Sequence, residues 1–174
     1  SLDLVDRLQW AIHFVLEDSF DICGPIYDYL AEEHSRSAWS ELADRLVKQL
    51  QESKPASQRC EFSAGMKRDL ISNWAMRALE EAGREEEILA LCRAEAKATA
   101  SYVRLVDLLI ALDRHQEAEE WILEGVQVTK QEWPGVARSL RDKRKELYTM
   151  RREWPTVAAM EVEDFVLHPS WDTF

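Results

Sequence analysis

The chain has 174 residues, 46% of them hydrophobic, with five glycines and five prolines, a composition that excludes a disordered tail and favours long helices. Its formal net charge of −11 opposes phosphate backbones and anionic lipids, which excludes non-specific nucleic-acid or membrane-surface binding by the domain as a whole. The three cysteines fit no disulfide framework or paired-thiolate zinc spacing, and no apolar run approaches twenty residues. These features predict a soluble, cytoplasmic protein.

The first part of the chain has helical period throughout. Apolar residues spaced three and four apart predict a helix over 4–18, and Pro25 suits the first turn of a second helix. Ser37 or a neighbour is expected to cap a third helix that ends near Leu50. Residues 1–53 are therefore predicted to form N-terminal helices, either a cap or the first hairpins. A polar stretch holding Pro55 predicts a linker over 54–65.

From residue 66 an apolar pattern recurs about every thirty residues. Leu79 returns as Leu109 and Leu91 as Trp121, which places Trp121 in the core. Because one helical hairpin cannot bury its own apolar stripe, a repeated pattern of this kind predicts stacked hairpins. The sequence thus predicts an all-α fold, an αα-hairpin superhelical array over 66–174 that resembles tetratricopeptide repeats. Its three hairpins are predicted at about 67–98, 102–129 and 136–168.

The turns between paired helices carry residues suited to sharp reversals. Gly83 ends one helix and tolerates the left-handed conformation, and the turn-competent Asp113 takes its place in the next copy. Gly125 stands where the previous copy has Glu95, and a small residue there would let two helices approach closely.

Residues with catalytic or metal-binding chemistry are present but not grouped. The acidic residues Glu117, Glu119 and Glu120 are expected on outer helix faces, and Cys92 is expected to be a buried, inert thiol. His115 and Glu119 form an i, i+4 pair without a third metal ligand. The sequence therefore predicts no enzyme, no catalytic residue, no metal site and no cofactor.

A local excess of positive charge lies between Lys130 and Arg152, where eight basic residues face three acidic ones. Arg138, Arg141 and Lys145 are spaced to share one helix face. One interpretation is that this face binds an acidic partner or phosphates. The other is that it is a solvated surface whose charge balances that of acidic neighbours.

The first helix of each hairpin lines the inner surface of helical solenoids, where partners bind. Trp74 is replaced by Arg104 in the next copy, which predicts a partly exposed position. The predicted binding residues on this surface are Asn73, Trp74, Arg77, Arg104, Asp107, Arg138, Arg141 and Lys145.

Ordered landmarks from about residue 36 onward resemble the helical region of bacterial SWIM zinc-finger proteins. They are Ala82-Gly83-Arg84, Glu95-Ala96, Ser101-Tyr102, Arg104-Leu105, Glu124-Gly125 and Pro169-Ser170. The resemblance implies a Cys-x-Cys…Cys-x-His finger upstream of such a region. This chain lacks it, since no cysteine stands two residues from another cysteine or from a histidine. Zinc is therefore expected only in that absent finger.

The ending His168-Pro169-Ser170-Trp171 looks like the opening of another unit, which predicts an array truncated at residue 174. The function predicted is that of a non-catalytic scaffold, the helical-repeat part of a SWIM zinc-finger protein, with a protein or peptide as partner and no membrane. The alternative is a nucleic-acid-associated module that uses the basic helix 138–152 beside the finger. Nucleic acid is then expected as a partner only through the full-length protein.

Overall fold

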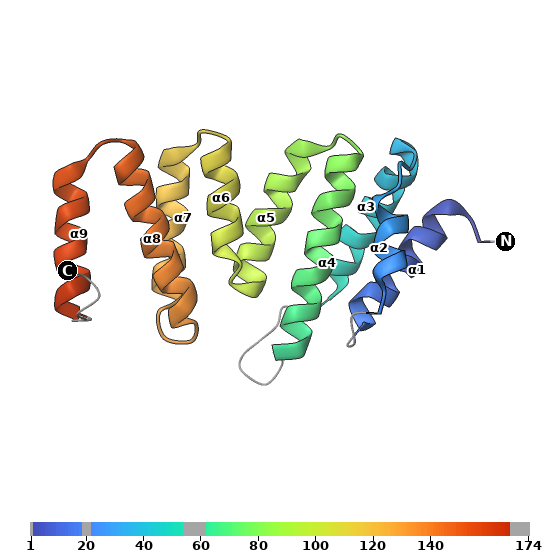
Figure 1. The fold of residues 1–174 in the computed structure, drawn as a ribbon, viewed down its shortest axis with the longest axis horizontal. Coiled ribbons are helices and arrows are strands. Elements are labelled where there is room, and N and C mark those ends of the chain that lie inside the picture. Colours follow the sequence, from blue (N-terminus) through green and yellow to red (C-terminus); the bar gives the residue numbers. More distant parts are fainter. Residues whose placement is uncertain (1, 19–21, 54–61, 168–174) are drawn as a thin grey trace. The chain divides into compact units, whose positions relative to one another are not determined.

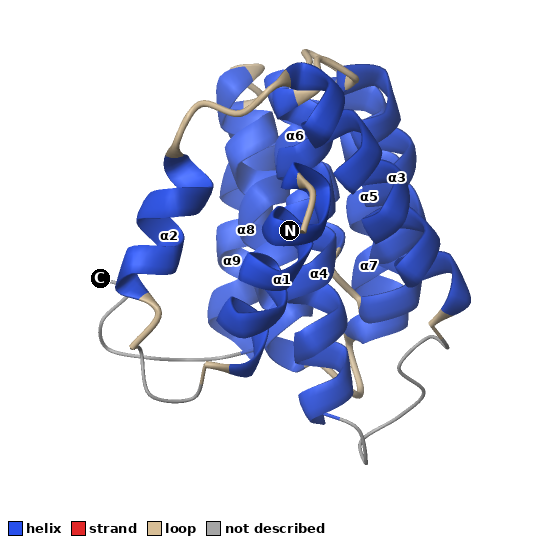
Figure 2. Ribbon diagram, turned by 90° about the vertical axis from the view of Figure 1, so that its right-hand side faces the viewer, coloured by secondary structure: helices blue, strands red, loops and turns tan. Residues whose placement is uncertain are grey.

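The computed structural model describes residues 2–18, 22–53 and 62–167, and this part of the chain is all helical, without strands (Figures 1 and 2). The helices are α1 (Leu4–Glu17), α2 (Gly24–Ala31), α3 (Arg36–Glu52), α4 (Phe62–Glu81), α5 (Glu85–Thr99), α6 (Tyr102–Ala111), α7 (His115–Thr129), α8 (Pro134–Met150) and α9 (Trp154–Leu167). The predicted all-α class with antiparallel hairpins is confirmed. Within the described ranges no helix has the length and apolar character needed to cross a membrane.

Helix starts follow the local chemistry of the sequence. Asp3 caps α1 by accepting a hydrogen bond of 2.7 Å from the Asp6 amide, and Pro25 occupies the first turn of α2 as predicted. Ser35, one of the neighbours of Ser37, caps α3 through the Ala38 amide. Of the predicted linker 54–65, residues 54–61 lie outside the described residues, and residues 62–65 belong to α4. The predicted stop at His168 and the expected further unit also lie outside them.

The chain divides into two compact units, residues 1–101 and 102–174. In the first unit α1 packs against α2, α3 and α4, while α4 packs against both α3 and α5. Residues before the predicted linker therefore share one hydrophobic core with α4. The largest side chains of this core include Trp39, Leu42, Leu46 and Leu79.

In the second unit α6 packs against α7 and α8, α7 packs against α8, and α8 packs against α9. Its fully buried side chains include Leu105, Leu109, Ile122 and Leu140. Leu109 thus repeats the burial of Leu79, as predicted. Trp121 is only half-buried, with its ring centroid 6.1 Å from that of Tyr102, so its predicted place in the core is corrected to the edge of the core.

The three turns at 82–84, 112–114 and 151–153 have one geometry. Gly83, Asp113 and Arg152 have φ angles of 69°, 58° and 60°, all in the left-handed region. In each turn the next residue donates to the carbonyl five residues back: Arg84 to Leu79 (2.8 Å), Arg114 to Leu109 (2.8 Å) and Glu153 to Tyr148 (2.9 Å). This is the Schellman helix end, and it confirms the left-handed ending predicted at Gly83.

Replacing Arg152 with glycine is expected to stabilise the protein by up to about 1 kcal/mol, since a side chain at positive φ is strained and glycine is not. Urea denaturation followed by circular dichroism measures this change. The control Ser139→Gly lies inside α8 and should lower stability by about 0.5 kcal/mol. An Arg152→Gly variant that is as unstable as Ser139→Gly would contradict this account of the turn.

Candidate functional site

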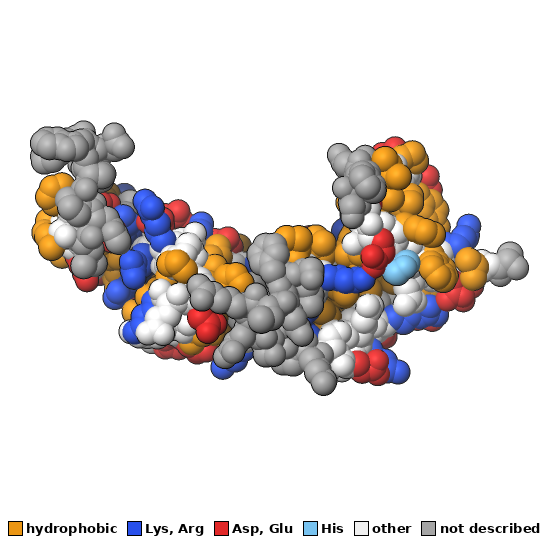
Figure 3. Space-filling model, turned by 90° about the horizontal axis from the view of Figure 1, so that it is seen from below, with side chains coloured by type: hydrophobic (Ala, Val, Ile, Leu, Met, Phe, Trp, Pro, Cys, Tyr) orange, Lys and Arg blue, Asp and Glu red, His pale blue; other side chains and the backbone are white. Residues whose placement is uncertain are grey.

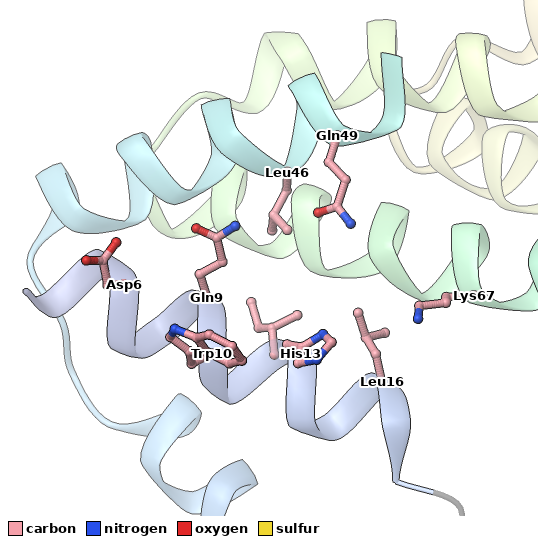
Figure 4. Close-up of a pocket in the computed structure, with 9 residues that line it drawn as sticks. Asp6, Gln9, Trp10, His13, Leu16, Leu46, Gln49 and Lys67 are labelled. Carbon is pink, nitrogen blue, oxygen red and sulfur yellow. The ribbon is translucent and has the colours of Figure 1, made fainter. Parts of the chain in front are cut away.

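A groove of about 440 Å³ opens on the first unit between α1, α3 and α4 (Figure 4). The α1 stripe of Val5, Leu8, Ala11 and Ile12 is buried, so the residues beside this stripe lie along the edge where α1 meets α3. The side chains that line the groove come from Asp6, Gln9, Trp10, Ile12, His13, Leu16, Leu46, Gln49 and Lys67.

Arg45 on α3 fixes one end of the groove. Its Nη1 donates to Asp6 Oδ1 at 2.8 Å and to Gln9 Oε1 at 3.0 Å, while its Nη2 donates to Glu41 at 2.8 Å. These bonds hold the Gln9 carbonyl toward Arg45. The amide NH₂ of Gln9 therefore remains a donor, on the helix edge that faces the groove (Figure 4).

Lys67 on α4 and Glu17 at the end of α1 form an ion pair at the other end of the groove. The hydrogen bond and the positive charge of Lys67 hold the pKa of Glu17 below its ordinary value. Gln49 reaches toward the groove from α3, and none of the described residues forms a hydrogen bond with its side-chain amide. Amide groups are thus available from α1 and α3, and an ion pair closes each end.

Three rings form an aromatic cluster on α1. The centroid of His13 lies 5.5 Å from Trp10, edge-on, and Phe14 lies 6.0 Å from Trp10. Trp10 is 50% and Phe14 54% exposed, values that are high for such large apolar side chains. At the N-terminal end of the face seen in Figure 3, exposed hydrophobic side chains lie beside acidic and basic groups. Exposed rings beside amide groups offer both apolar contact and hydrogen-bond donors.

The predicted binding residues on α4 have different surroundings from those expected. Trp74 is only 9% exposed and belongs to the core of the first unit, so the prediction of a partly exposed tryptophan is wrong. Arg77 stacks over Trp74 at 5.2 Å and over Trp39 at 5.9 Å, and its Nη2 donates to the Leu30 carbonyl at 3.1 Å. Arg77 therefore covers Trp74. Asn73 is exposed.

The remaining predicted binding residues lie in the second unit, on α6 and α8. Asp107 is exposed and pairs with Lys143 at 3.0 Å, and Arg104 is half-buried. Arg138 is exposed and Arg141 half-buried, and neither has an acidic partner within the described residues. Three of the predicted binding residues thus belong to the first unit and five to the second.

Four of the eight cations of the segment 130–152 pair with carboxylates. Lys145 lies 3.0 Å from Asp164 and 3.3 Å from Glu161 on α9, so it does not form a free basic face with Arg138 and Arg141. Burial lowers the pKa of Lys145, but its hydrogen bonds to Asp164 and Glu161 outweigh burial and raise the pKa overall. Lys143, Arg144 and Arg151 also pair with carboxylates.

Glu119 lies within a contact between α7 and α8, which corrects the expectation that it sits on an outer, solvated face. Its carboxylate accepts hydrogen bonds from the Tyr148 hydroxyl and from Arg151, the latter at 2.8 Å, and lies 3.8 Å from Arg144. Burial raises the pKa of Glu119, but the bonds from Tyr148 and Arg151 outweigh it and lower the pKa overall. Glu119 is thus held as a carboxylate that joins two helices.

The remaining candidates for metal binding or nucleophilic chemistry, His115 and Cys92, make ordinary structural contacts. His115 Nε2 lies 3.4 Å from Asp113 rather than bridging to Glu119, and the described ranges contain no group of three side chains arranged to hold a metal ion. Cys92 is buried as predicted, and its thiol lies 3.2 Å from the Met76 sulfur. Cys60 lies outside the described residues.

The groove itself was missed at the sequence level. Its signal is the pair of i, i+4 spacings beside the α1 stripe, Gln9 with His13 and Trp10 with Phe14, which put amide, imidazole and aromatic groups along one edge. No family model, curated protein or solved structure matches the chain. The resemblance to SWIM zinc-finger proteins therefore stays a prediction.

Proposed function

We propose that the chain is a non-catalytic interaction scaffold that binds a protein or peptide segment in the groove between α1, α3 and α4. In this proposal it is the helical-repeat part of a SWIM zinc-finger protein of the cytoplasm, with superhelical stacking of its tetratricopeptide-like hairpins. The finger would carry the zinc, and the residues of this chain would supply contacts alone.

The observation that carries the proposal is the exposed aromatic edge formed by Trp10, which lines the groove, and by Phe14 beside it. Soluble proteins rarely leave a tryptophan and a phenylalanine half-exposed side by side, and such patches are typical of binding surfaces. The volume of about 440 Å³ also falls within the range of roughly 300–1,000 Å³ found for ligand pockets. Gln9 and Gln49 would bond to peptide groups while the rings receive a side chain.

Affinity capture from native cell extract, compared between variants, tests this function. The variant Trp10→Ala/Phe14→Ala removes the aromatic edge and is expected to recover its specific partner at a level reduced about tenfold or more, as for aromatic anchor residues. The matched control Trp133→Ala/Trp154→Ala removes two exposed tryptophans of the second unit and should retain the partner. Circular dichroism confirms that both variants fold. Equal recovery by both variants would contradict a binding role for the groove.

The alternative is a nucleic-acid module on the helix 138–152. Its support comes from Arg138, Arg141 and Arg152, which lack acidic partners in the described part of the chain. Because Lys143, Lys145 and Arg151 are engaged, we expect no salt-sensitive binding of this chain to DNA or RNA. Fluorescence anisotropy at 50 and 200 mM salt measures it. Retention that falls with salt and disappears in Arg138→Ala/Arg141→Ala/Lys145→Ala would instead support the nucleic-acid function.

A further inference from the structure

We infer that the partner of the groove is a basic peptide segment, one that carries lysine or arginine beside apolar side chains. This inference rests on the proposed function, because it names the chemistry of the ligand for the same groove.

The region that contributes one wall of the groove is strongly acidic. Residues 1–35 contain eight carboxylates and one arginine, a net charge of −7, which is most of the −11 of the whole chain. Asp28 on α2, and Glu32 and Glu33 after it, are exposed and have no basic partner within the described residues. Since α2 packs against α1, a cation that approaches the aromatic cluster enters a negative field.

The rings of Trp10, His13 and Phe14 form a cluster that can receive a cation. Trp10 offers the ring type that binds cations most strongly, and half of its surface is open. Within the same unit the chain already uses this interaction, because Arg77 stacks over both Trp39 and Trp74. A lysine or arginine of the partner would bind Trp10 in the same manner, with its apolar neighbours on Phe14.

At one end of the groove, Lys67 already occupies the place beside Glu17 that a cation of the partner would take. Lys67 and Glu17 have side chains 47% and 52% exposed, and a pair this open contributes little to stability. A cation of the ligand can therefore replace Lys67 at Glu17 without unfolding the site. At the opposite end Arg45 pairs with both Asp6 and Glu41. Replacement of Arg45 at Asp6 by a cation of the ligand is therefore less favourable.

The test is fluorescence anisotropy with a defined, labelled probe, a twelve-residue peptide of alternating lysine pairs and leucine or phenylalanine. A second peptide has glutamate at each lysine position. We expect saturable binding of the lysine peptide that weakens between 50 and 300 mM salt, and no binding of the glutamate peptide.

Two sets of variants connect binding to the groove. Trp10→Ala/Phe14→Ala should weaken the lysine peptide about tenfold or more. Glu17→Gln should weaken it and Lys67→Met should strengthen it, each by roughly twofold to fivefold, since one removes the acceptor and the other removes its competitor. The variant Asp28→Asn/Glu32→Gln/Glu33→Gln should also weaken binding, while the matched control Glu80→Gln/Glu81→Gln/Glu86→Gln, which neutralises three exposed carboxylates elsewhere, should not.

The outcomes separate this inference from the proposed function. A glutamate peptide that binds as well as the lysine peptide, and still depends on Trp10, would contradict a basic ligand but would still support the groove as a binding site. Lysine-peptide binding that both carboxylate variants reduce equally, with no effect at Trp10, would be diffuse attraction to an acidic protein and would overturn the inference. The Glu17→Gln and Lys67→Met pair keeps the test independent of any folding defect in the aromatic variant.

Discussion

Replacing Glu95 with alanine is expected to lower the free energy of unfolding by about 3–5 kcal/mol, because it leaves a buried arginine without its counter-charge. Arg68 on α4 binds Glu95 on α5 in a bidentate pair, with Nε–Oε2 at 2.8 Å and Nη2–Oε1 at 2.7 Å. The two side chains are 10% and 3% exposed. Arg68 Nη1 also donates to the Ser53 carbonyl at 2.9 Å, so the pair joins the end of α3 to α4 and α5.

Urea denaturation followed by circular dichroism provides the measurement for Glu95→Ala. The control is Glu52→Ala, which removes one partner of the exposed Lys48–Glu52 pair and should change stability by less than about 1 kcal/mol. The double variant Arg68→Met/Glu95→Leu removes both charges together and should recover much of the loss, since no ion is then left buried. A Glu95→Ala variant within about 1 kcal/mol of the parent would show that the pair is not closed to water.

Replacing Gly125 with alanine is expected to destabilise the second unit by about 1–3 kcal/mol through overpacking. A Cβ at this position would lie 2.6 Å from Leu140 Cδ1 and 2.9 Å from Tyr102 Cγ, closer than such atoms approach. The better helix propensity of alanine returns about 1 kcal/mol, which does not offset the displacement of a buried leucine and a buried ring.

The matched control for Gly125 is Gly135→Ala, because a Cβ at Gly135 on α8 would meet nothing within 4 Å. This control should leave stability unchanged or raise it by up to about 1 kcal/mol. Both variants are compared by urea denaturation with the same circular-dichroism signal. Equal stability of the two variants would contradict the close packing of α7 against α6 and α8.

The helices and their turns could be predicted from the sequence because both depend on neighbouring residues. The turn at Asp113 adopts the same left-handed ending as the turn at Gly83, and the small residue at Gly125 allows the close approach that was expected. The equivalent ending at Arg152 carried no signal, since arginine has no preference for positive φ. Neighbouring residues thus predict the helices and turns, but they do not predict a positive φ at a residue type that rarely adopts one.

Contacts between helices could not be predicted in the same way. Comparing Trp74 with Arg104 assumed the same surroundings in two copies, whereas Trp74 is covered by Arg77 in a core that includes Trp39. Lys145 shares helix spacing with Arg138 and Arg141, yet it pairs with Asp164, nineteen residues away on α9. Periodicity tells which face of a helix is apolar, but not which neighbour covers it.

The groove could not be predicted either, because it depends on contacts between residues far apart in the sequence. Its end at Asp6 is fixed by Arg45, 39 residues along the chain, and its other end by the pairing of Glu17 with Lys67, 50 residues apart. The i, i+4 pairs on α1 pointed to a polar and aromatic edge, but only the packing of α1 against α3 and α4 makes that edge one side of an opening.

Site-specific photo-crosslinking from the groove tests most directly whether this chain is a partner-binding scaffold. A photoreactive side chain at Gln49, which is exposed at the groove, is compared in native cell extract with the same group at Gln116, which is exposed on α7. The account predicts one discrete protein adduct at Gln49 that disappears in the Trp10→Ala/Phe14→Ala background, with a crosslinked segment rich in lysine or arginine. Identical adducts from both positions, or an adduct at Gln49 that persists without Trp10 and Phe14, would contradict it.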